Sequence, residues 1–154
     1  MYATNSDGYE VMIRNCTTCG KTVHSMYFNQ GLVLTGSYSG GKLQSGTTMK
    51  WKMPVYQTGW ISIYIPCKMS SGNTNQTYDP SLYAITVNSL GLNILMPTGT
   101  YDELGITSTE TKYYKWAEYY VSQDDVLNGE IEINFTSNVS SYRMIFDGEI
   151  RIEF

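Results

Sequence analysis

The strongest constraint on the fold is a recurring alternation of apolar and polar residues with a period of two. Residues 47–53 show it most clearly, because three large apolar side chains alternate there with two lysines. The apolar positions are Met49, Trp51 and Met53, and the polar ones are Lys50 and Lys52. Such a segment has one buried and one solvated face, which is typical of a strand in an antiparallel sheet.

The same pattern recurs along the chain, and no segment has the 3.6-residue spacing of an amphipathic helix. Fourteen tyrosines favour strands, and fourteen glycines favour the turns between them. The predicted strands lie in 8–14, 22–28, 31–36, 47–53, 60–67, 81–97 (two strands joined near 88–91), 112–122, 129–136 and 142–154, with an exposed loop at 68–80. We therefore predict one all-β domain over 1–154, a two-sheet antiparallel β-sandwich or jelly roll.

The last segment alternates in two parts. Met144 and Phe146 face one side, with Tyr142 before them, and the pattern resumes after Asp147-Gly148. A β-bulge at Asp147-Gly148 would explain the shift, and a hairpin turn at the same place is the alternative.

Charge and hydropathy exclude several classes of partner. The formal net charge is −4, and the ten Lys and Arg are scattered, so we expect no nucleic-acid partner. No apolar run approaches the roughly 18 residues needed to cross a bilayer, and residues 1–10 lack the features of a secretory signal. We therefore expect no membrane partner and no targeting segment.

Candidate catalytic groups are few, and we predict that the protein is not an enzyme. His24 is the sole histidine, and no nucleophile motif lies near it. The acidic pairs Asp102-Glu103 and Asp124-Asp125 are adjacent in turns, where they are expected to be solvated rather than to face each other across a bond.

Two of the three cysteines and the histidine lie within residues 15–24. Cys16, Cys19 and His24, with Cys67 as a distant fourth ligand, have the residue types of a structural zinc site. Cys16 and Cys19 could instead form a catalytic redox pair or a structural disulfide. We favour free thiols in a hairpin turn with Gly20 at positive φ.

Calcium is a further candidate for a structural metal, because carboxylates in loops can hold it. The available donors are Asp7, Asp124, Asp125 and Asp147, and their spacing matches no EF-hand loop. We expect no cofactor, with a structural calcium or zinc ion as the alternative.

Aromatic side chains on the solvated faces of two strands are the candidate ligand-binding residues. Trp and Tyr rings stack on sugar rings, while nearby amides and carboxylates bind hydroxyl groups. The residues expected to face away from the core are Trp60, Tyr64, Tyr114, Trp116 and Tyr120. Burial in the core or in contacts between subunits is the competing interpretation of such residues.

The order of the later segments resembles the galactose-binding-like jelly roll of carbohydrate-binding modules, over roughly residues 45–154. Trp116 with Tyr119 before an acidic turn, and Phe146 with Asp147 in the last strand, carry this resemblance. Similar domains occur in tailed-phage head-surface, fibre and appendage proteins. The cysteine-bearing first hairpin and the extra residue Gly148 depart from the pattern.

The resemblance implies a non-enzymatic structural protein of a bacteriophage virion, such as a capsid decoration, head-fibre or tail-appendage protein. Its expected partners are other virion proteins, further copies of itself and surface glycans, and its expected location is the virion surface. The alternative is a carbohydrate-binding module of an extracellular glycan-degrading enzyme or adhesin.

Overall fold

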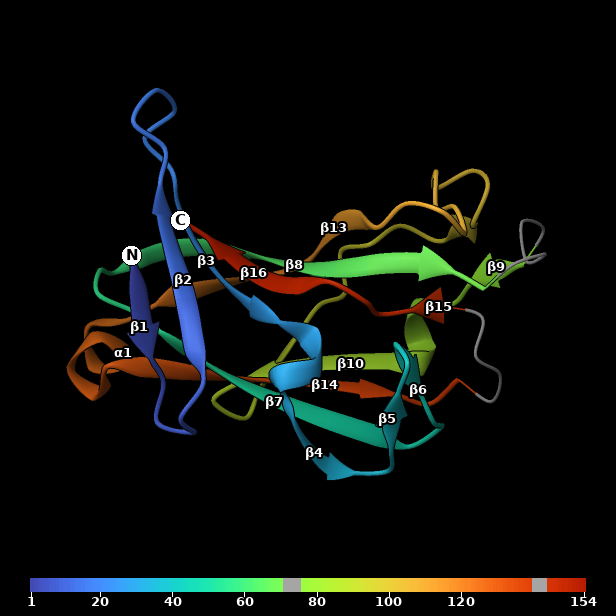
Figure 1. Cartoon of the computed structure of the whole chain (residues 1–154), viewed down its shortest axis with the longest axis horizontal. Coiled ribbons are helices and arrows are strands. Elements are labelled where there is room, and N and C mark those ends of the chain that lie inside the picture. Colours follow the sequence, from blue (N-terminus) through green and yellow to red (C-terminus); the bar gives the residue numbers. More distant parts are fainter. Residues whose placement is uncertain (71–75, 140–143) are drawn as a thin grey trace.

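The fold was determined as a computed structural model, which describes residues 1–70, 76–139 and 144–154. Two sheets lie one above the other and enclose the core between them (Figure 1). Their strands pair antiparallel throughout, so the predicted two-sheet β-sandwich is confirmed. Residues 71–75 of the predicted loop and Tyr142 of the predicted last strand lie outside the described residues.

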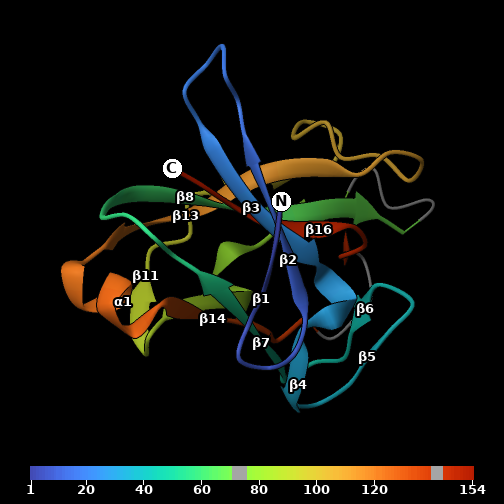
Figure 2. The same cartoon turned by 60° about the vertical axis from the view of Figure 1, so that its left-hand side comes forward.

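The larger sheet has seven strands, in the order β1-β2-β3-β16-β8-β13, and β15 also pairs with β8. Its strands are β1 (Tyr2–Thr4), β2 (Glu10–Asn15), β3 (Thr22–Tyr27), β8 (Gly59–Met69), β13 (Lys112–Val121), β15 (Met144–Ile145) and β16 (Glu149–Glu153). The β2–β3 hairpin projects beyond the rest of the sandwich (Figure 2). Strand β1 was not predicted from the sequence.

The second sheet has five strands, in the order β11-β10-β14-β7-β4. Its strands are β4 (Leu32–Thr35), β7 (Thr47–Pro54), β10 (Tyr83–Val87), β11 (Leu90–Leu92) and β14 (Glu130–Ser137). Two small ribbons pair β5 (Tyr38–Ser39) with β6 (Lys42–Leu43) and β9 (Thr77–Tyr78) with β12 (Gly99–Thr100). The 3₁₀-helices are Phe28–Gln30 and Pro80–Leu82.

The core forms where the apolar faces of the two sheets meet. On β7 the residues Met49, Trp51 and Met53 are fully buried, as their alternation with the lysines predicts. Aromatic rings fill the centre: Tyr83 stacks on Phe135 at 5.6 Å between ring centroids, and Trp116 meets Phe135 edge-on at 5.3 Å. Such pairs contribute about 0.5–1.5 kcal/mol beyond the area they bury.

A β-bulge at Trp116 interrupts β13. Lys115 pairs with Tyr64 and Ala117 pairs with the next residue, Ile63, so Trp116 is one residue too many for the ladder. Trp116 and Ala117 are both fully buried, which breaks the alternation of the strand. Consequently, Tyr114 and Trp116 face the opposite side from the one that regular alternation with Tyr120 predicts, whereas Tyr120 keeps its predicted side.

The turns follow the local residue types. Asn88 and Ser89 adopt φ of 49° and 69° and join β10 to β11, at the position predicted for that hairpin. At Asp147-Gly148 the chain breaks between β15 and β16, and both of these strands run antiparallel to β8. The chain therefore keeps its direction through the break, which excludes the hairpin alternative.

One α-helix, α1 (Gln123–Asn128), lies where only a solvated acidic turn was predicted. Ser122 and Asp125 form a capping box, and Gly129 ends the helix with φ of 92°. Asp125 is buried: its carboxylate accepts hydrogen bonds from the hydroxyl of Tyr119 at 2.6 Å and the amide of Asn88 at 2.9 Å. The expectation that Asp125 is a solvated acid is wrong, because this carboxylate ties α1 to β13 and to the turn between β10 and β11.

We expect the two tryptophans of the paired strands β8 and β13 to differ in their effect on stability. Trp116→Ala removes a fully buried ring and should lower the free energy of unfolding by about 3–5 kcal/mol. The matched change Trp60→Ala removes an exposed ring and should cost less than about 1 kcal/mol. Urea unfolding followed by circular dichroism measures both; equal losses would contradict the assigned burial.

Candidate functional site

The outward side of the seven-stranded sheet, called here the outer face, carries the exposed aromatic residues of the two longest strands. The core side of β8 presents Ile61, Ile63 and Ile65, all buried, so Trp60 and Tyr64 point outward. Beyond the bulge, Tyr120 of β13 pairs with Trp60 and points the same way. The outer face therefore gathers three of the five aromatic residues predicted to bind a ligand.

Trp60 and Tyr120, defined here as the Trp60 platform, form the most exposed part of this group. Trp60 is 66% exposed and Tyr120 is 51% exposed, and their ring centroids lie 5.6 Å apart in an edge-on arrangement. Large rings of this kind are normally sheltered by the protein's own side chains. The platform therefore presents an open aromatic surface to solvent.

A loop after β11 borders the platform, and the bulge holds it there. The extra residue Trp116 leaves its carbonyl oxygen free to accept a hydrogen bond from the amide of Leu95 at 2.8 Å. This bond brings Leu95 and Asn93 beside Trp60. Together with Gly91, Leu92 and Glu118 they line a hollow of about 290 Å³.

The chemistry of this hollow combines an aromatic surface with exposed polar groups. Glu118 accepts a hydrogen bond from Lys115 at 2.6 Å, which fixes the carboxylate at the edge of the hollow. The Asn93 amide supplies both a donor and an acceptor. An aromatic ring flanked by amide, carboxylate and ammonium groups has the groups needed to stack on a sugar ring and bind its hydroxyls.

The remaining two predicted aromatic residues do not lie on this face, and the bulge is the reason. Trp116 is fully buried, and its indole Nε1 donates to the sulfur of Cys67 at 3.3 Å. Tyr114 turns toward the core, and its hydroxyl donates to the carbonyl oxygen of Leu104 at 2.7 Å. The prediction that Trp116 and Tyr114 form part of an exposed platform is therefore corrected.

The four candidate zinc ligands do not converge. His24 is buried and its Nδ1 donates to the carbonyl oxygen of Pro54 at 2.8 Å. His24 pairs with Ile152 of β16, which pairs in turn with Ile63 of β8. Cys67 lies four residues after Ile63, roughly 13 Å along β8. Among the described residues, no three His, Cys, Asp or Glu side chains form a group that could hold a metal ion. The zinc-site hypothesis is corrected on these grounds.

The four candidate calcium donors are also separated. Asp7 lies between the ammonium groups of Lys50 and Lys52, at 3.8 Å and 3.7 Å. Asp124 and Asp125 belong to α1, and Asp147 precedes β16. The described part of the chain brings no three of these carboxylates together.

Cys16 and Cys19 are joined by a disulfide at the tip of the β2–β3 hairpin. The favoured prediction of free thiols at these positions is therefore wrong. The turn itself is as expected, because Gly20 has φ of 70° and its amide donates to the carbonyl oxygen of Cys16. The four-residue loop brings the two Cα atoms to 5.5 Å, a separation that a disulfide spans readily.

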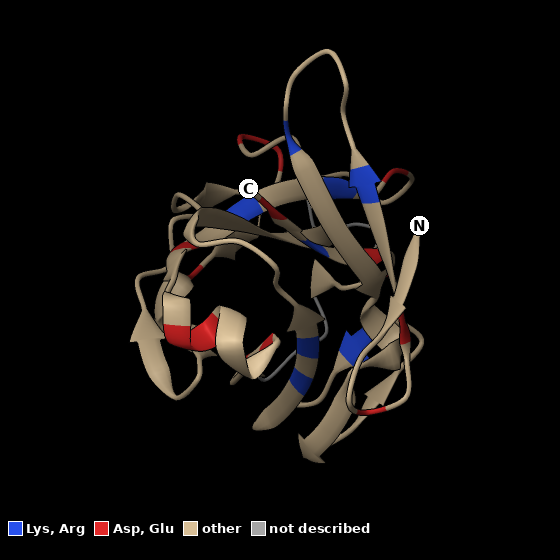
Figure 3. Cartoon of the chain, turned by 90° about the vertical axis from the view of Figure 1, so that its left-hand side faces the viewer, with Lys and Arg blue, Asp and Glu red and all other residues tan. Residues whose placement is uncertain are grey.

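Figure 3 shows Lys and Arg on several strands, and acidic residues on α1. No helix of the described residues is long and apolar enough to cross a bilayer.

The sequence matches no family model and no curated protein. Among solved structures, it is similar to the GH26-CBM35 β-(1,4)-mannanase of Podospora anserina, with a TM-score of 0.50 and 8% identity. This match covers 84% of the present chain and 27% of the mannanase chain. The similarity shows a shared β-sandwich fold.

A family 35 carbohydrate-binding module from Clostridium thermocellum is also similar, with a TM-score of 0.44 and 15% identity. That match covers 92% of the present chain and 96% of the module.

Thiol counting tests the cysteine assignment. Burial raises the pKa of Cys67 to about 12, so native protein should not react with a thiol reagent at mildly alkaline pH. Unfolded, unreduced protein should show one reactive thiol, and reduction should raise the number to three, all the cysteines of the chain. Three reactive thiols before reduction would contradict the disulfide.

The burial of His24 makes a prediction about pH. Loss of solvent lowers the pKa of His24 below its ordinary value of 6.5, so the native state takes up this proton less readily than the unfolded chain. Its contribution to stability is complete above pH 6.5 and is lost as the pH falls below that value.

Proton NMR can follow this group directly, because the chain has a single histidine. Its titration midpoint is expected below 6.5 in native protein and near 6.5 in urea. A native midpoint above 6.5 would contradict the assigned burial.

Proposed function

We propose that this protein is a non-catalytic carbohydrate-binding module that holds a glycan against the Trp60 platform. The observation that carries the proposal is the exposed Trp60 ring beside Tyr120, with the polar groups of Asn93 and Glu118 at the edge of the same hollow. Rings of this exposure stack on the apolar faces of sugars, while the polar groups fix the orientation of the hydroxyls.

The fold supports the same function. The mannanase with the similar fold has a carbohydrate-binding module in its name, and a β-mannan is therefore the first ligand to test. The glycan-binding alternative drawn from the sequence is thus better supported than a role in a virion. Virion partners, self-assembly and a virion-surface location stay predictions.

An extracellular location fits this proposal. The Cys16–Cys19 disulfide is at an exposed hairpin tip, where a reducing cytosol would open it. Polysaccharides outside the cell are in an oxidising environment, and a disulfide persists in the same environment.

The test is binding to a panel of immobilised polysaccharides, β-mannan included, by affinity electrophoresis and calorimetry. Trp60→Ala should weaken binding at least about tenfold, because truncating the central aromatic of a site commonly costs about 1.4 kcal/mol or more. Tyr120→Ala should weaken it less, since Tyr120 is the less exposed ring of the pair.

Tyr56→Ala is the matched control, because it removes an exposed aromatic ring that lies outside the platform, beside His24. It should leave binding unchanged. Absence of binding by the unaltered protein to every glycan, or equal losses in the Trp60 and Tyr56 variants, would overturn the proposal.

A further inference from the structure

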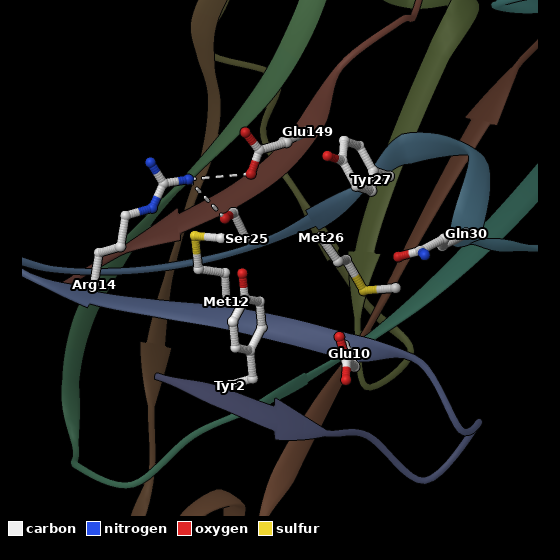
Figure 4. Close-up of a pocket in the computed structure, with 9 residues that line it drawn as sticks. All are labelled: Tyr2, Glu10, Met12, Arg14, Ser25, Met26, Tyr27, Gln30 and Glu149. Carbon is white, nitrogen blue, oxygen red and sulfur yellow. Dashed lines mark hydrogen bonds and ion pairs between the residues drawn. The ribbon is translucent and has the colours of Figure 1, made fainter.

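A second hollow, of about 360 Å³, opens on the outer face at the β1–β2–β3 end of the sheet (Figure 4). None of its residues belongs to the Trp60 platform. Its lining includes two tyrosines, two carboxylates, a guanidinium group and an amide, from Tyr2, Tyr27, Glu10, Glu149, Arg14 and Gln30.

Strand register explains why the sheet is hollow there. Tyr2 of β1 pairs with Met12 of β2, and Met12 pairs with Ser25 of β3. Tyr27 lies two residues beyond Ser25 and pairs with Glu149 of β16. The small side chain of Ser25 therefore lies between the longer side chains of Met12 and Arg151 on the neighbouring strands. The side chains of Tyr2 and Tyr27 project from the same face of the sheet.

The tyrosine rings are open to solvent. Tyr2 is 60% exposed and Tyr27 is 61% exposed. Neither hydroxyl bonds to a side chain or carbonyl of the described residues. Two exposed tyrosine rings and two phenol hydroxyls thus border one hollow. In a sugar-binding site, such rings stack on the apolar face of the sugar and such hydroxyls hydrogen-bond to its hydroxyl groups.

The charges at the two ends of the hollow differ in what they contact. The Arg14 guanidinium donates to Glu149 at 3.2 Å and to the Ser25 hydroxyl at 3.2 Å, and Glu149 also pairs with Arg151 at 3.6 Å. The basic end is therefore already neutralised by protein groups.

Glu10 has no such compensation. It lies on the same strand as Arg14 but four residues away, roughly 13 Å along β2. Its carboxylate makes no hydrogen bond or ion pair within the described part of the chain. An uncompensated negative charge beside tyrosine rings attracts a cation through both the carboxylate and the ring faces.

We propose that this hollow binds a protonated amino-sugar unit of a glycan, with the ammonium group at Glu10 and the sugar ring against Tyr2 and Tyr27. The Gln30 amide, which lies beside Tyr27, and the guanidinium group of Arg14 supply further hydrogen-bonding groups for its hydroxyls (Figure 4). An anionic sugar is disfavoured by Glu10, and a neutral one leaves that charge without a partner.

A sugar fits better than a basic peptide because the hollow shares its face with the Trp60 platform. Three strand-to-strand steps, roughly 14 Å, separate β2 from β8, and Trp60 lies roughly 20 Å further along the strands from the level of Tyr27. An oligosaccharide that spans roughly 24 Å can therefore reach both places. The inference rests on the proposed glycan-binding function and adds to it the class of sugar that the second hollow selects.

Calorimetry with two glucosamine oligosaccharides of equal length, one free and one N-acetylated, tests the proposal at a mildly acidic pH. Acetylation removes the positive charge and keeps the sugar backbone. The unaltered protein should bind the free amine form at least about fivefold more tightly, and added salt should reduce that preference. Glu10→Gln should abolish the preference.

Glu110→Gln is the matched control: it removes the same charge from an exposed position in the loop before β13, outside the hollow. It should keep the preference. Equal binding of the two oligosaccharides, no binding of either, or an unchanged preference in the Glu10 variant would overturn the inference.

The two proposals fail in different ways. If neutral glycans bind in a Trp60-dependent manner but amino sugars gain nothing from Glu10, only the inference fails; if no glycan binds at all, both fail. A lysine oligopeptide of the same charge that binds through Glu10 as tightly as the amino sugar would overturn the assignment of a sugar.

Discussion

The bulge at Trp116 decides how the two longest strands of the larger sheet present their side chains. A single extra residue places Trp116 and Ala117 on the core side in succession. The indole then packs among the core aromatics, and its backbone carbonyl anchors the loop at Leu95. The same irregularity therefore completes the core and builds the wall of the candidate site, with Tyr120 left beside Trp60 on the outside.

Sequence reasoning succeeds where a strand has one buried face and one solvated face without a local break in the alternation. The faces of residues 47–53 in β7 and of residues 60–65 in β8 follow from alternation alone, because each inward residue is buried against the opposite sheet and each outward one keeps access to water. The outward position of Trp60 is predicted correctly for this reason. The two-sheet architecture follows from the number of such strands and the turns between them.

Sequence reasoning fails where pairing with a distant strand, or a local break in a strand, decides the existence of an element or the face on which its side chains lie. Nothing in 112–122 marks the bulge, so alternation places Tyr114 and Trp116 on the wrong face. Strand β1 is three residues long and exists through its pairing with β2, which a local pattern does not reveal. Tyr2 escapes prediction for the same reason, and the position of Tyr27 near it depends on the pairing of β1, β2 and β3. By contrast, the spacing of Ser122 and Asp125 is a readable sign of a capped helix.

The three tryptophans of the chain divide cleanly between the interior and the surface. Trp51 and Trp116 are sealed inside the sandwich, while Trp60 faces the solvent. The intrinsic fluorescence of the protein consequently has two separable parts. Emission that a soluble quencher reaches comes from Trp60 and reports on the outer face, and the shielded emission reports on the integrity of the core.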